Sequence, residues 1–77
     1  MARAVYYVVH DHGEWKISYN QQHYGPYASQ AAAIREAVDT AQKAGREGHD
    51  AQVLVQGQNS QFRTEWTYGH DPYPPKG

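Results

Sequence analysis

One segment of this 77-residue chain has the periodicity of a helix, and its apolar stripe consists mostly of alanine. Ser29 suits an N-cap, because its hydroxyl can accept from free N–H groups of the first turn, and the helix is predicted from about Gln30 to Ala44. Gly45 and Gly48 are expected to end it. The stripe recurs at spacings of three and four residues and contains Ala33, Ile34, Ala37, Val38, Ala41 and Ala44. Such small side chains let a helix lie close to a sheet, where bulky aromatics can fill the remaining space.

Four other segments are rich in β-branched and aromatic residues and predict strands. These segments are Val5–His10, Glu14–Tyr19, Ala51–Gln56 and Gln61–Tyr68. Gly13 can take the positive φ of a short hairpin loop between the first two. Residues 20–28 are polar and contain Gly25 and Pro26, so they are predicted to form a loop.

The order strand, strand, helix, strand, strand predicts an α+β fold: a four-stranded, mainly antiparallel sheet with one helix packed on one face. If the third strand lies beside the first, all neighbouring strands run antiparallel. We expect a single domain over residues 1–69. Residues 70–77 contain Pro72, Pro74 and Pro75, which indicates an extended, polyproline-like tail.

Composition excludes several classes of protein. The chain has no cysteine, so disulfides and thiolate metal sites are excluded. Leu, Ile, Val and Phe number only 10 residues, but 10 aromatic residues and a formal charge of -1 favour a small folded domain over a disordered one. No apolar run is long enough for a membrane span, and the N-terminus lacks a signal-peptide pattern, so a cytoplasmic protein is expected.

A single helix can cover only one face of the predicted sheet. The first strand places Val5, Tyr7 and Val9 on one side, and Tyr6, Val8 and His10 on the other, and both sets are largely apolar. Either set could therefore belong to the uncovered face, unless the tail or the loop around Tyr24–Tyr27 folds over it. The candidate binding surface predicted here is Tyr6, Val8, His10, Arg63, Trp66 and Tyr68.

An uncovered aromatic face indicates a partner, and symmetric homodimers are the commonest soluble assemblies. The sequence therefore predicts a non-enzymatic binding module that self-associates or binds another protein. The alternative is weak single-stranded nucleic-acid binding, with Tyr6, Trp66 and Tyr68 stacking bases beside Arg63. The Lys and Arg residues are scattered and balanced by acids, which argues against a phosphate-binding surface.

Other site chemistry has little support in the sequence. His10 and His12 stand two residues apart and could share a metal, but nothing fixes a third ligand. The serines lie on a strand, at the predicted N-cap and in a turn, and none has the context of a nucleophile. No glycine-rich phosphate loop is present. We therefore predict no catalytic residue, metal or cofactor.

The sequence resembles the small bacterial proteins of the family called domain of unknown function 2188, over about residues 5 to 74. The resemblance rests on short motifs in a fixed order: Tyr7-x-Val9, Gly13-x-Trp15-x-Ile17, Ser29 with Ala33-Ile34 and Ala37, Gly57, Phe62, and Thr67-Tyr68-Gly69-x-Asp71-Pro72. Two positions depart from the family pattern, since Ala32 replaces a capping Glu and Trp66 replaces a polar residue. The resemblance implies the same single-domain fold and brings no activity, cofactor or catalytic residue.

Overall fold

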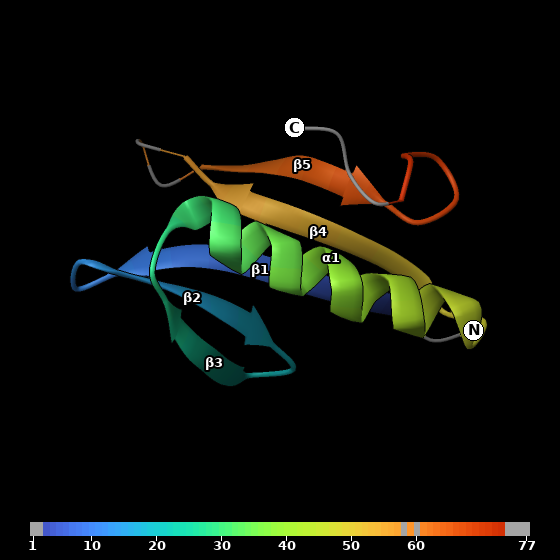
Figure 1. Ribbon diagram of the computed structural model, residues 1–77, viewed down its shortest axis with the longest axis horizontal. Coiled ribbons are helices and arrows are strands. Elements are labelled where there is room, and N and C mark those ends of the chain that lie inside the picture. Colours follow the sequence, from blue (N-terminus) through green and yellow to red (C-terminus); the bar gives the residue numbers. More distant parts are fainter. Residues whose placement is uncertain (1–2, 58, 60, 74–77) are drawn as a thin grey trace.

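The computed structural model describes residues 3–57, 59 and 61–73, which form one helix packed on a five-stranded sheet (Figure 1). The predicted α+β class is confirmed, while the predicted number of strands is one too few. The sheet order is β3-β2-β1-β4-β5. The elements are β1 (Arg3–Asp11), β2 (Glu14–Tyr19), β3 (Gln22–Tyr27), α1 (Gln30–Arg46), β4 (Asp50–Gln56) and β5 (Phe62–Thr67).

Strand β3 occupies the segment that was predicted to be a loop. It pairs antiparallel with β2 and forms an edge of the sheet. Asn20 and Gln21 form the two-residue turn between them, with φ values of 52° and 66°, as a tight hairpin of this kind requires. Pro26 is tolerated because an edge strand need not donate every backbone hydrogen bond. The segment was predicted to be a loop because it is polar, and it is polar because the strand exposes most of its residues to solvent.

The extra strand also changes the direction of everything that follows it. Because β3 reverses the chain once more, α1 returns it to the end of the sheet where β1 begins. β4 therefore enters parallel to β1, with Tyr6 beside Val53 and Val8 beside Val55. The expectation that all neighbours run antiparallel is wrong for this pair, and the sheet is mixed.

The helix begins where the sequence predicted. Ser29 is the N-cap, and its Oγ accepts a hydrogen bond of 3.1 Å from the backbone N–H of Ala32. The helix continues to Arg46, two residues beyond the predicted end. Gly48, with φ 100°, closes it: its N–H donates to the Gly45 carbonyl, and the His49 N–H donates to the Ala44 carbonyl. This pair of bonds satisfies carbonyls that the last turn leaves free.

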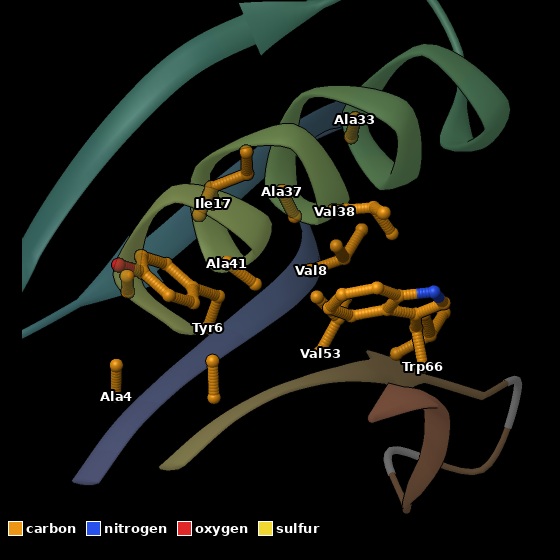
Figure 2. Packing of buried hydrophobic residues seen from close by; sticks show 13 residues of the cluster. Ala4, Tyr6, Val8, Ile17, Ala33, Ala37, Val38, Ala41, Val53 and Trp66 are labelled. Carbon is orange, nitrogen blue, oxygen red and sulfur yellow. The ribbon is translucent and has the colours of Figure 1, made fainter. Parts of the chain in front are cut away.

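The core lies between the helix and the face of the sheet on which Tyr6 and Val8 stand (Figure 2). Alanines of the helical stripe approach this face closely, as predicted. Trp66 of β5 is 2 % exposed and lies beside Val53 in the register of the sheet. The buried hydrophobic residues are Ala4, Tyr6, Val8, Ile17, Ala33, Ala37, Val38, Ala41, Ala44, Ala51, Val53, Val55 and Trp66.

Residues after β5 turn back toward the helix. The indole Nε1 of Trp66 donates to the carbonyl oxygen of Pro72 at 2.9 Å. The hydroxyl of Tyr73 donates to Asp39 of α1 at 2.7 Å. The first part of the predicted tail therefore contacts the domain near Trp66, while residues 74–77 of that tail lie outside the described residues.

Within the part of the chain that the structure describes, the helix lacks the length and apolarity that crossing a bilayer requires.

Candidate functional site

The face of the sheet opposite α1 carries an apolar group that we call the open-face cluster: Val5, Tyr7, Val9, Leu54 and Phe62. Tyr7 is 37 % exposed and Phe62 is 43 % exposed, and the other three side chains are half-buried. The rings of Tyr7 and Phe62 meet edge to face, with their centroids 5.3 Å apart. No other described element packs on this side of the sheet, so large apolar side chains face solvent there.

An irregularity in β5 places Phe62 in this cluster. Val53 pairs with Trp66, but the next residue, Leu54, pairs with Thr64, so β5 holds one extra residue at this point. A bulge of this kind reverses the alternation of side chains beyond it. Phe62 and Trp66 are four positions apart in the sequence and nevertheless lie on opposite faces of the sheet. Simple alternation would have put them together.

Charged side chains border one end of the open-face cluster. The Lys16 ammonium lies 3.7 Å from Asp11 and 3.8 Å from Glu14. The imidazole of His12 lies 2.8 Å from the Asp11 carboxylate, and this hydrogen bond holds the pKa of the Asp11 carboxyl below its usual value. Asp11, His12 and Glu14 are exposed to solvent and Lys16 is partly exposed, so each pair adds little to stability. Asp11, Glu14 and Lys16 together carry a net charge of -1 at this end.

Three of the six residues predicted for the binding surface lie in the core. Tyr6, Val8 and Trp66 are 6 %, 0 % and 2 % exposed, and they pack beneath α1 (Figure 2). The prediction chose the face that the helix covers, so this part of the candidate surface is corrected. Burial also removes Tyr6 and Trp66 from the rings that could stack on a nucleic-acid base.

Of the other three predicted residues, His10 and Arg63 are exposed and Tyr68 is half-buried, and the three do not form one surface. His10 stacks on Trp15, with ring centroids 4.6 Å apart, and Arg63 is paired with Glu65. Both line a hollow of about 580 Å³ beside the start of α1. Tyr68 lies at the opposite end of the domain, where its ring packs against Gly45. The guanidinium of Arg63 is already offset by a carboxylate, which weakens any role in binding phosphate.

A second, smaller groove of about 260 Å³ opens between β3 and α1. It is lined by Tyr6, Ile17, Tyr24, Tyr27, Glu36 and Thr40. Burial, followed by the neighbouring Tyr19, raises the pKa of the Tyr6 phenol to about 12, and burial also raises the pKa of the Tyr27 phenol. The phenols of Tyr6 and Tyr27 therefore remain neutral in the groove at physiological pH. Its volume is below the roughly 300 to 1,000 Å³ of ordinary ligand pockets.

Residues 3–57, 59 and 61–73 contain no assembled metal site. No three His, Asp or Glu side chains in these ranges converge closely enough to hold an ion. His10 stacks on Trp15, whereas His12 turns to Asp11 in the hairpin, so the two imidazoles have different neighbours. The third ligand that the sequence left open is not supplied within the described part of the chain.

A signal for the open face was present in the sequence. Arg3 and Asp11 belong to the same alternating set as Tyr7, and both are exposed. Charges at the two ends of one set indicate the side of a strand that meets solvent. The position of Phe62 carried no such signal, because it depends on the bulge in β5.

Comparison with known proteins identifies the family of this chain. The family model described as "Uncharacterized protein conserved in bacteria (DUF2188)" matches residues 6–68 of the chain. No curated protein and no solved structure gives a significant match. The matched range runs from β1 to the end of β5 and includes the bulge and the helix. The resemblance found in the sequence is confirmed, and the chain belongs to this family of uncharacterised bacterial proteins.

Proposed function

We propose that this protein is a non-enzymatic binding module that self-associates through the open face of its sheet. The observation that carries the proposal is the contact between Tyr7 and Phe62, two large rings that pack on each other while each remains more than a third exposed. Aromatic side chains of this kind dominate the energetics of protein interfaces. Val5, Val9 and Leu54 extend the apolar surface around them.

The size of the domain suits a second copy as the partner. The molecule measures 34 × 28 Å across its two longer axes. A face of these dimensions is comparable to the roughly 800 Å² that each partner contributes to an interface of standard size. The polar side chains around the cluster, such as Ser18, Gln52 and Thr64, can form the solvated rim of such an interface.

The electrostatics favour a protein partner over a nucleic acid. The open face carries the basic residues Lys16 on β2 and Arg3 on β1. Two carboxylates flank Lys16, and Asp50 is the register partner of Arg3 on β4. Affinity for a polyanion requires several unpaired cations in one place. An apolar face with a slightly negative border meets another protein surface more readily than a phosphate backbone.

Sedimentation equilibrium over a range of protein concentrations tests the proposal. We expect the mass to rise from 8.7 kDa toward twice that value as concentration increases. Replacing Phe62 with Thr keeps strand propensity but removes the exposed ring, and it should weaken association by at least roughly tenfold. The matched control is Tyr24→Thr, which removes a ring of similar exposure, 46 %, from the helix side of the sheet. A wild-type protein that stays monomeric at millimolar concentration would contradict the proposal.

A further inference from the structure

The outward side chains of β1 have a self-complementary order. They alternate with the helix-facing residues Ala4, Tyr6, Val8 and His10, of which the first three are buried, and they run Arg3, Val5, Tyr7, Val9, Asp11. A positive charge stands at one end, a negative charge stands at the other, and Tyr7 is at the midpoint. When a second copy of the strand is laid antiparallel to the first, opposite charges therefore meet at both ends and apolar side chains meet between them.

Two arrangements with two-fold symmetry bring the open faces of two copies together while keeping their β1 strands aligned. An axis along the strands places each residue of β1 opposite its own copy, so Arg3 faces Arg3 and Asp11 faces Asp11. An axis across the strands at Tyr7 reverses β1, so Arg3 of each copy faces Asp11 of the other, and Val5 faces Val9. Like charges placed opposite each other oppose association, so the order of charges favours the second arrangement.

The neighbouring strands fit the same axis. Tyr7 is in register with Ser18 on β2 and with Leu54 on β4. An axis across the strands at Tyr7 therefore also brings Leu54 against Leu54 of the second copy, and Ser18 against Ser18. Apolar side chains meet apolar ones at the centre of the interface, where burial contributes most.

Neighbouring charges weaken the attraction between Arg3 of one copy and Asp11 of the other at both ends of β1. Asp50 is the register partner of Arg3 on β4, and Lys16 lies 3.7 Å from Asp11. Each inter-copy pair is therefore partly screened, and it sets the orientation of the two copies more than the strength of their association.

Resting on the proposed self-association, we infer that the second copy packs its open face against the first with the two β1 strands antiparallel, Tyr7 at the two-fold axis and each Arg3 beside the Asp11 of the other copy. The ligand of this surface is thus a second copy of the chain in one defined orientation.

Charge reversal tests the orientation. Dissociation constants are measured by sedimentation at low salt for the wild type, Arg3→Glu, Asp11→Arg and the double variant. Each single reversal creates two like-charge pairs across the antiparallel interface and should raise the dissociation constant roughly tenfold. The double variant restores both pairs and should return to within about threefold of the wild type. An equimolar mixture of the two single variants should associate as tightly as the wild type.

The outcomes separate this inference from the proposal on which it rests. If the wild type associates but the double variant remains as weak as the single ones, the face is an interface and the orientation is wrong. If the wild type does not associate at all, both fail. Arg35→Glu is the matched control, because it makes the same change of charge on an exposed position of α1. Its dissociation constant should stay near that of the wild type, and an equal loss there would show that net charge alone acts.

Discussion

The ring of Tyr68 lies directly against the backbone of Gly45 in the last turn of α1. A Cβ atom added to Gly45 would overlap the Cγ and both Cδ atoms of that ring. Gly45 is a helical residue with an ordinary φ, so a glycine is not needed here for its backbone freedom. It is needed because the absence of a side chain leaves space for the Tyr68 ring. This contact joins the end of the helix to the end of β5.

The first prediction concerns Gly45→Ala. Replacing an exposed helical glycine with alanine normally stabilises a protein by about 1 kcal/mol. Here we expect the opposite, a loss of about 1–3 kcal/mol in the free energy of unfolding, because the new methyl group displaces the Tyr68 ring. Urea denaturation at one fixed protein concentration measures the change, since self-association also affects apparent stability.

A double-mutant cycle identifies the cause of that loss. In a Tyr68→Ala background, the ring is absent and Gly45→Ala should regain its usual stabilising sign. If the alanine substitution destabilises both backgrounds equally, the ring is not responsible for the glycine requirement.

The helix shows how far local sequence can specify structure. The small hydroxyl residue Ser29 and the stripe containing Ala33, Ala37 and Ala41 predicted its start and its buried face, and both are confirmed. These features are local, since a cap and a periodic stripe need no knowledge of the rest of the chain. The end of the helix was predicted too early, because Gly45 reads as a terminator although it serves as a packing site for Tyr68.

The sheet was less accessible to sequence reasoning. Segment Gln22–Tyr27 has the composition of a loop and becomes a strand through its hairpin with β2. Missing that strand reversed the expected direction of β4 relative to β1. Both of these features depend on tertiary pairing. The predicted strand Val5–His10 is apolar on both sides, so its alternation alone did not show whether the helix covers Tyr6 or Tyr7. The charged residues Arg3 and Asp11, which mark the Tyr7 side as the open one, lie outside that predicted strand.

The second prediction concerns Trp66. Trp66→Phe keeps an aromatic ring but removes the indole N–H that donates to Pro72, and it leaves space in the core. We expect a loss of about 2 kcal/mol in the free energy of unfolding, from lost packing and one lost hydrogen bond. Chemical denaturation followed by circular dichroism measures it. Tyr73→Phe removes only an exposed hydroxyl bond to Asp39 and should cost less than about 1 kcal/mol.

The third prediction concerns alkaline pH. The pKa of the Tyr6 phenol is raised to about 12, chiefly by burial, whereas the pKa of a tyrosine in the unfolded chain is 10.0. The folded state therefore holds this proton more tightly, so its contribution is complete below pH 10 and is lost as the pH rises toward 12. Ultraviolet titration should show a late-ionising phenol that is absent from Tyr6→Phe. If the two titration curves coincide, Tyr6 is not held protonated by its surroundings.

We propose that copies of this chain associate through the open face, with Tyr7 and Phe62 at its centre. Backbone amide NMR spectra recorded at low and high protein concentration test it most directly. We expect concentration-dependent shifts or broadening at the open-face residues of β1, β4 and β5, with Tyr24 and Tyr27 on the helix side unchanged. Shifts confined to the β3 edge, or spectra that do not change with concentration, would contradict it.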